Sequence, residues 1–165
     1  TVEAMSSSGE CALIAYLTQE QARFYRLAYS YLNNREDALD AVQTAVCRAL
    51  ERQDSLRSAG AMRGWFYRIL INVCMDILRE RGRSVPLEQW EDPGAEDPLP
   101  PDGSLFERVR ALPEAAGTVV RLRFYEELSL KEIAAVTGCS INTVKSRLYS
   151  GLRKLRIAME GAEIE

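Results

Sequence analysis

The sequence predicts an all-α protein with two small helical domains joined by an acidic, proline-rich linker. Apolar residues recur every three or four positions through most of the chain, which is the spacing of one buried helix face. Residues 84–104 hold five of the six prolines and six acidic residues, with no basic residue. Such a stretch is typical of an extended linker. We therefore expect domains at residues 10–83 and 104–160, separated by a linker at 84–103.

Three long helices are expected in the first domain. In-phase apolar residues predict helices over residues 13–32, 35–52 and 65–83. Asn34 stands where its side chain can accept a hydrogen bond from the first turn of the second helix. A polar loop at residues 54–63 separates the second helix from the third. These elements indicate a small helical bundle.

The third helix carries a polar stripe opposite its apolar one. The members of this stripe lie three or four residues apart and share one helix face: Arg68, Asn72, Asp76, Arg79 and Arg83. Hydrogen-bonding side chains on one face, next to aromatic residues, suit nucleic acid. A solvated face on a small bundle explains the same pattern, so the stripe alone does not establish binding.

The second domain is expected to contain two short helices followed by a helix-turn-helix. Ser104 and Glu107 have the spacing of a capping box, in which each side chain bonds the other's backbone. Pro113 suits the first position of a helix over residues 114–125. The helix-turn-helix follows at residues 129–156.

The helix-turn-helix has features of a motif that binds DNA. Ser129 can cap its first helix, Gly138 can end that helix in the left-handed conformation, and Ser140 can cap the second helix. Residues 141–156 include five basic residues and no acidic one, whereas a solvated face usually mixes both signs. A basic second helix can enter the major groove of DNA. The alternative is a helical hairpin with a solvated basic face.

Composition argues against several other classes of protein. No apolar run approaches the roughly 20 residues that a membrane span requires. The chain has no histidine, and none of its four cysteines forms a CxxC pair, so we expect no metal site, no cofactor and buried thiols. No nucleophile or phosphate-loop motif is present, and we do not expect an enzyme. The polar N-terminal residues are expected to be a loose end without signal-peptide features.

Both halves of the chain resemble the extracytoplasmic-function group of bacterial sigma factors, which belong to the sigma-70 family. LPEAAGTVVRLRFYEELSLKEIAAVTGCSINTVKSRLYSGLRKL resembles region four of that family. REDALDAVQTAVCRALE and GWFYRILINVCMDILRERGR resemble two motifs of region two, and they precede the linker as in the family. The chain departs from the family pattern at Leu39, Thr44, Val46, Gly117 and Asn142.

The resemblance implies an alternative sigma factor, which binds core RNA polymerase, recognises and melts specific promoters and starts transcription. Polymerase would be bound through Asp40, Val42, Gln43 and Arg48. The minus-ten element would be read by Arg57, Ser58, Arg63, Trp65, Arg68, Asn72, Asp76 and Arg79, with Phe66 beside Trp65 near the melting fork. The minus-thirty-five element would be read by Thr143, Lys145, Ser146, Arg147, Ser150, Arg153 and Lys154.

The resemblance also implies the partners: core RNA polymerase, promoter DNA and an anti-sigma factor, either membrane-anchored or cytosolic, that holds the chain inactive. The chain would be a cytoplasmic monomer when free, without membrane insertion. Because phosphate neutralisation dominates DNA binding, a net charge of −3 predicts weak DNA affinity for the chain alone.

The alternative function is a helix-turn-helix regulator that binds DNA as a dimer without polymerase. A scaffold that binds only protein is a third possibility and predicts no DNA footprint.

Overall fold

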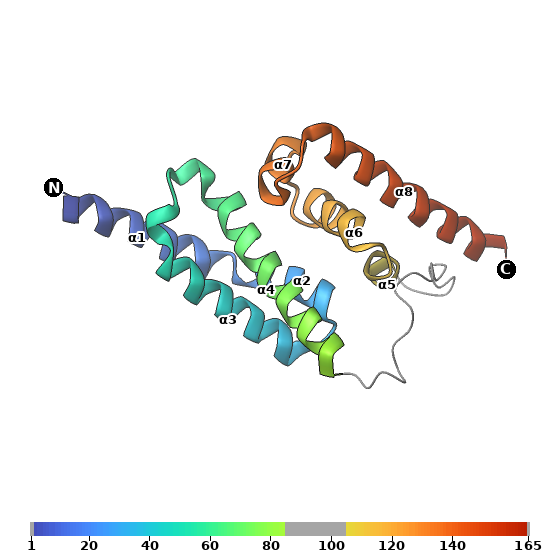
Figure 1. The fold of residues 1–165 in the computed structure, drawn as a ribbon, viewed down its shortest axis with the longest axis horizontal. Helices are drawn as coiled ribbons and strands as arrows, with labels where there is room; N and C mark the ends of the chain where they lie inside the picture. The colour runs from blue at the N-terminus through green and yellow to red at the C-terminus, as the bar shows by residue number, and fades with distance from the viewer. Residues whose placement is uncertain (1, 85–104, 165) are drawn as a thin grey trace. The chain divides into compact units, whose positions relative to one another are not determined.

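The structure confirms an all-α protein with two helical units. The computed structural model describes residues 2–84 and 105–164, and no strand occurs in those two ranges. The chain divides into two compact units, Thr1–Ser84 and Val85–Glu165. Figure 1 shows the helices of each unit along the chain.

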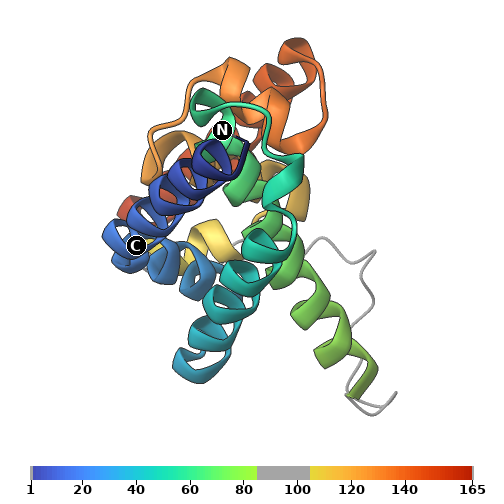
Figure 2. The ribbon, with the colours of Figure 1, turned by 90° about the vertical axis from the view of Figure 1, so that its left-hand side faces the viewer.

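Four α-helices and two short 3-10 turns form the first unit. The α-helices are α1 (Val2–Gln19), α2 (Gln21–Leu32), α3 (Arg35–Glu51) and α4 (Met62–Ser84). The turns η1 (Gln53–Ser55) and η2 (Ala59–Ala61) connect α3 to α4. Helices α2, α3 and α4 pack against one another, and α1 packs on α2 (Figure 1, Figure 2).

An aromatic cluster joins three helices of the first unit. Phe24 of α2 and Phe66 of α4 are fully buried, and their ring centroids lie 4.5 Å apart. Tyr16 of α1 meets these two rings edge-on, with centroid separations of 5.6 Å and 6.5 Å. Tyr67 meets Phe24 edge-on at 5.8 Å. Aromatic pairs at such separations and tilts stabilise a core beyond the area that they bury.

Polar contacts tie the ends of α2, α3 and α4 together. The backbone N–H of Asp37 donates to Asn34 Oδ1 at 3.0 Å, which confirms the predicted cap of α3. Arg81 of α4 forms an ion pair with Asp37 and also donates to the Leu32 carbonyl at 2.8 Å. One guanidinium therefore links α4 to the last residue of α2 and to the first turn of α3.

The second unit contains four α-helices and one π-helical turn in residues 105–164. These elements are α5 (Leu105–Arg110), α6 (Glu114–Val120), the π-helical turn η4 (Arg121–Tyr125), α7 (Leu130–Thr137) and α8 (Ile141–Ile164). Helices α6 and α7 both pack against α8. Helices α7 and α8 form the predicted helix-turn-helix.

The predicted caps of the helix-turn-helix are confirmed. The Ser129 and Glu132 side chains each accept from the other's backbone N–H at 3.1 Å. Gly138 ends α7 with a φ of 72°, which is the left-handed conformation that glycine adopts without strain. The Thr143 N–H donates to Ser140 Oγ at 3.2 Å at the start of α8.

Two buried glycines permit close packing in the second unit. A Cβ on Gly151 of α8 would lie 2.8 Å from Val120 Cγ2 and 3.5 Å from Ala116 Cβ. A Cβ on Gly117 would lie 2.8 Å from Arg121 Nη1. Helices α6 and α8 thus approach at a point where a side chain does not fit without displacing its neighbours, and Gly117 leaves room for a buried guanidinium.

Three helix predictions were wrong in detail. The helix predicted over residues 13–32 is interrupted at Glu20, where φ is −103° and ψ is 12°. The polar start of the chain is helical rather than loose, because a helix, once nucleated, extends by one hydrogen bond per residue. The helix predicted over residues 114–125 changes from α to π at Arg121, which apolar periodicity does not signal.

Two expectations fall outside the described residues. The acidic linker was predicted at residues 84–103, of which only Ser84, the last residue of α4, is described. Ser104, the predicted cap of α5, also lies outside the described part of the chain. The boundaries of the two domains therefore stay predictions.

We predict that Gly151→Val destabilises the second unit. The new side chain must displace Val120 in a packed contact, and overpacking of this kind costs about 1–3 kcal/mol. Ser150→Val is the matched control, because it places the same β-branched side chain at an exposed neighbouring position. Native-state hydrogen exchange of the α6 and α8 amides measures the effect. Equal protection in the two variants would contradict the close approach.

Candidate functional surfaces

The predicted polar stripe of α4 is exposed over the residues whose side chains the structure describes. Its apolar counterpart, including Leu70 and Val73, is buried in the first unit. Four side chains of the stripe are exposed along the helix: Arg68, Asn72, Asp76 and Arg79. The structure therefore makes these donors and acceptors available to a binding partner.

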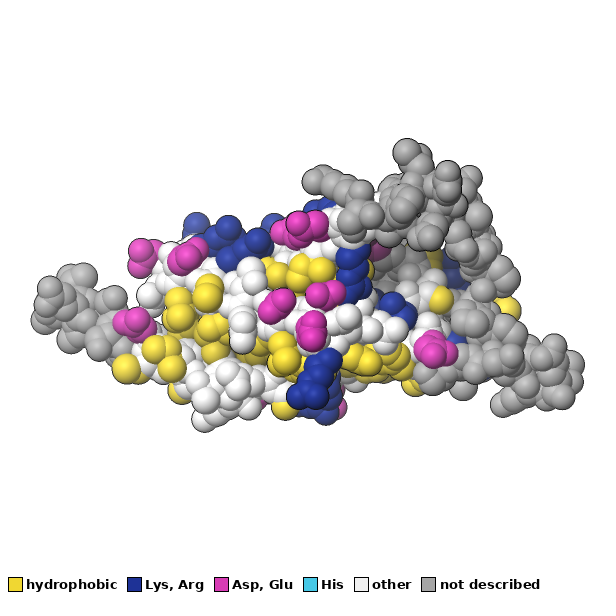
Figure 3. All heavy atoms as spheres, turned by 90° about the horizontal axis from the view of Figure 1, so that it is seen from below, with side chains coloured by type: hydrophobic (Ala, Val, Ile, Leu, Met, Phe, Trp, Pro, Cys, Tyr) yellow, Lys and Arg dark blue, Asp and Glu magenta, His cyan; other side chains and the backbone are white. Residues whose placement is uncertain are grey.

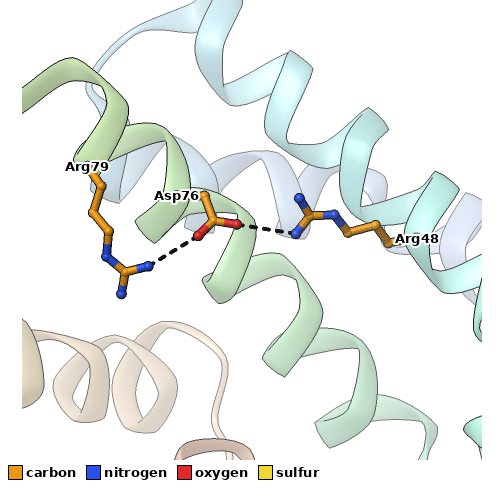
Figure 4. Close-up of polar contacts among 3 residues, drawn as sticks. All are labelled: Arg48, Asp76 and Arg79. Atoms are coloured by element: carbon orange, nitrogen blue, oxygen red, sulfur yellow. Dashed lines mark hydrogen bonds and ion pairs between the residues drawn. The ribbon is translucent and has the colours of Figure 1, made fainter. Parts of the chain in front are cut away.

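Asp76 is at the centre of a charged contact that joins α3 to α4 (Figure 4). Its Oδ1 lies 3.2 Å from Nη1 of Arg79, one turn along α4. Its Oδ2 lies 3.4 Å from Nη1 of Arg48 in α3. The side chains of Arg48, Asp76 and Arg79 are 33%, 51% and 66% exposed, so the contact lies at the surface.

The loop between α3 and α4 is held by a tryptophan. Trp65, near the start of α4, donates from Nε1 to Ser55 Oγ at 3.0 Å. Ser55 in turn donates to the Arg52 carbonyl at 2.7 Å. Arg57 and Ser58, between η1 and η2, are exposed.

Two of the predicted residues near this loop are less accessible. Arg63 is half-buried. Phe66, expected near the melting fork, is instead a fully buried member of the aromatic cluster. Its position on the apolar stripe of the helix already pointed to the core.

The predicted polymerase-binding side chains on α3 differ in accessibility. Asp40 and Gln43 are exposed and Arg48 is half-buried, but Val42 is only 8% exposed and packs into the core. Leu39, which the predicted set does not include, is 44% exposed next to Asp40. Its exposure could have been predicted from the sequence, because this apolar residue lies outside the buried stripe of the helix.

Exposed apolar and charged side chains are mixed on one face of the protein (Figure 3). The face in Figure 3 shows hydrophobic side chains among charged groups of both signs. Exposed charge alone therefore does not single out a binding region on that face. The candidate surfaces are defined by their positions on particular helices.

Basic and polar side chains lie along α8. The predicted residues Lys145, Ser146, Ser150 and Arg153 are exposed. The other three, Thr143, Arg147 and Lys154, are half-buried. Tyr149, which the predictions omitted, is 67% exposed on the same helix; as an aromatic residue outside the buried stripe, it could have been found from the sequence.

Two predicted residues of α8 contact the turn between α7 and α8. The Thr143 and Ser140 hydroxyl oxygens lie 3.0 Å apart. Arg147 Nη1 donates to Cys139 Sγ at 3.1 Å, and the Cys139 thiol donates to the Thr137 carbonyl at 3.7 Å. The Arg147 guanidinium is therefore held against the turn in this structure.

The four cysteines are free, but they are not all buried. Cys74 is buried and Cys139 is half-buried, whereas Cys11 and Cys47 are exposed. The prediction of buried thiols was wrong for the latter two, because they lie beside the apolar stripes of their helices rather than on them. In the described ranges, no cluster of three or more cysteine, aspartate or glutamate side chains is suited to holding a metal ion.

No helix within residues 2–84 and 105–164 combines the length and the apolar character needed to cross a bilayer.

In the π-helical turn, burial raises the pKa of Tyr125 above its ordinary value, while the charge of Arg121 acts in the opposite direction. Phe124, next to it, is 54% exposed. This turn lies outside the predicted surfaces.

Comparison with known protein families gives two matches in the chain. Residues 17–84 match the family model of sigma-70 region 2, and residues 103–155 match that of sigma-70 region 4. The RNA polymerase sigma factor SigV of Bacillus subtilis is 38% identical, over 89% of this chain and 90% of that protein. The ECF RNA polymerase sigma-E factor of Escherichia coli K12 is 31% identical, over 68% of this chain and 69% of that protein.

A solved structure shares the fold. The sigma factor RpoE of Bartonella quintana, solved in complex with the anti-sigma factor NepR, superposes with a TM-score of 0.68. The alignment covers 96% of this chain and 98% of that one, at 24% sequence identity. At this identity the likeness supports the fold.

We predict that Ser55→Ala loosens the contact between Trp65 and the loop. Loss of one hydrogen bond of about 1 kcal/mol should speed exchange of the Trp65 indole N–H roughly two- to ten-fold. Nuclear magnetic resonance of that proton measures the rate. Ser58→Ala, an exposed serine in the same loop, is the control. Equal rates in Ser55→Ala and the unmodified chain would show that the bond does not form in solution.

Proposed function

Because the chain belongs to the extracytoplasmic-function group of RNA polymerase sigma factors, we propose that it is a non-catalytic subunit through which core RNA polymerase recognises and melts specific promoters. One observation carries the proposal for both units. Each unit matches one sigma region and presents an exposed polar helix face, on α4 in the first and α8 in the second. Such faces provide the donors and positive charge that DNA binding requires.

The exposed side of α3 is the proposed polymerase-binding surface. Asp40 and Gln43 supply polar contacts, and Leu39 supplies an exposed apolar group beside them. Arg48 lies two turns further along the helix. Val42 is buried, so its part in binding is to hold the exposed residues in place rather than to contact polymerase.

The loop before α4 and the exposed face of that helix are the proposed minus-ten surface. A melted base must be unstacked at a cost of a few kcal/mol, which a preformed site can offset. Trp65 contributes by anchoring the loop through Ser55. The residues proposed to meet DNA are Arg57, Ser58, Arg63, Arg68, Asn72 and Arg79.

Helix α8 is the proposed minus-thirty-five surface. Arg147 is the best candidate for a base contact, because a guanidinium can donate two hydrogen bonds to guanine in the major groove. One of its five N–H donors is used on Cys139, through Nη1. Lys145 and Ser146 lie next to it on the helix, while Ser150, Arg153 and Lys154 are proposed to meet phosphates. Thr143 holds the helix start through Ser140.

We also propose that an anti-sigma factor regulates the chain in the cytoplasm. The sigma factor RpoE, which shares this fold, was solved with such a partner. A partner that covers the surface around Asp40 and Arg48 would exclude polymerase. Recovering a tagged chain with its bound proteins from the native host, then adding those proteins to polymerase, tests this. If the chain still binds polymerase at a saturating concentration of the partner, the proposal is wrong.

Run-off transcription tests the proposed function. Purified bacterial core polymerase is incubated with a pool of genomic promoter fragments, with and without the chain. Discrete transcripts that require the chain are expected, and their start sites define both promoter elements. If no transcript appears and the chain retards DNA without polymerase, a stand-alone dimeric regulator becomes the better account.

We predict that Arg147→Ala weakens discrimination at the minus-thirty-five element. Loss of a bidentate base contact should cost about 1–3 kcal/mol of preference for one base pair. Competition between promoters that differ at single positions of this element measures the preference. Unchanged preference at every position would remove Arg147 from base reading.

We predict a different effect for Arg153→Ala, a phosphate contact on the same helix. Binding of the holoenzyme should weaken for all sequences alike, and the salt dependence of binding should fall by about one unit. Titration of holoenzyme binding against salt concentration measures this slope. A change in sequence preference without a change in slope would contradict the assignment.

A further inference from the structure

A single carboxylate lies between two arginines that belong to different proposed surfaces. Arg48 lies on the polymerase-binding helix α3, and Arg79 lies on the minus-ten face of α4. Building on the proposed function, we propose that Asp76 is a positioning residue. It orients Arg79 for promoter DNA and Arg48 for polymerase, and it acts through these arginines rather than by contacting DNA itself.

The geometry supports this division of roles. Each carboxylate oxygen of Asp76 faces a different guanidinium, Oδ1 toward Arg79 at 3.2 Å and Oδ2 toward Arg48 at 3.4 Å (Figure 4). Because a guanidinium donates in fixed directions, a carboxylate in this position restricts how each side chain turns. One side chain therefore sets the orientation of groups on two helices.

Electrostatics argues against a direct DNA contact by Asp76. A carboxylate is repelled by the phosphate backbone, whereas the two arginines are attracted to it. Arg79 is the most exposed of the three side chains, at 66%, and can reach a partner without breaking the core. The group of three carries two positive charges and one negative, so a net positive charge faces the partner.

The arrangement also connects the two surfaces. Because Asp76 is paired with both arginines, an acidic group of polymerase that binds Arg48 in this orientation also holds in place the carboxylate that orients Arg79. The orientation of the DNA-facing arginine then depends on whether α3 is engaged. Exposed ion pairs contribute little to the free energy of unfolding. We therefore expect the loss of Asp76 to change the preference for DNA sequence rather than the stability of the chain.

Transcription from paired promoters tests the proposal. Two promoters are compared, a preferred one and one substituted within the minus-ten element, and the readout is the ratio of their transcripts. A change in stability or in overall charge affects both promoters alike and leaves this ratio unchanged. Asp76→Asn keeps the shape of the side chain but removes its charge. We expect this ratio to fall about two- to five-fold, as befits an exposed ion pair. Glu80→Gln, an exposed carboxylate one turn further along α4, is the control and should leave the ratio unchanged.

A double-mutant cycle separates positioning from direct contact. If Asp76 acts through Arg79, Asp76→Asn has no further effect on the ratio in an Arg79→Ala background. If it lowers the ratio equally in both backgrounds, Asp76 reads DNA directly and the proposal fails. An unchanged ratio for Asp76→Asn in the unmodified chain also overturns it.

The polymerase side is tested by the matching cycle. Asp76→Asn should lower the affinity of the chain for core polymerase about two- to five-fold, and this loss should vanish in an Arg48→Ala background. An equal loss in both backgrounds contradicts the role of Asp76 toward Arg48. If the unmodified chain supports no transcription, the proposed function fails; if it does and either cycle is additive, only the positioning role fails.

Discussion

The packing of α4 against α2 is the constraint on which the first unit depends. Phe24 and Phe66 meet at its centre, and both are fully buried. An α-helix turns through one full turn in 3.6 residues, so fixing one face inward also fixes which residues face outward. Burial of Phe66 and Leu70 therefore sets Arg68, Asn72 and Arg79 at the surface. The packing of the core therefore determines which face of α4 is exposed, and this is the face proposed to bind DNA.

In the second unit, the helix caps and one glycine fix the position of α8. The caps at Ser129 and Ser140 and the left-handed Gly138 fix the turn between α7 and α8. Gly151 lets α8 lie close to α6. The basic residues of α8 are then held on a helix that is anchored both at its start and in its middle. A rigid helix of this kind suits recognition in the major groove.

Local sequence rules predicted the parts of the structure that depend on neighbouring residues. The caps at Asn34, Ser129 and Ser140 involve residues three apart, and each was predicted and confirmed. The exposed stripe of α4 followed from helical periodicity. The break at Glu20 was missed because no glycine or proline marks it.

Contacts between distant residues were beyond the sequence. The pairing of Asp76 with Arg48 spans 28 residues and depends on how α3 and α4 are rotated about their axes. The same holds for the approach of Gly151 to Val120. Family resemblance supplied functional roles for individual residues, Val42 among them, although Val42 lies on the apolar stripe of its helix and is buried.

Promoter recognition by this chain is proposed to require RNA polymerase. Fluorescence anisotropy of a labelled promoter fragment, titrated with the chain in the presence and absence of core polymerase, tests this most directly. We expect weak, salt-sensitive and sequence-independent binding by the chain alone, and tight, sequence-specific binding once core polymerase is added. Tight, sequence-specific binding by the chain alone, with two chains per fragment, would contradict the account.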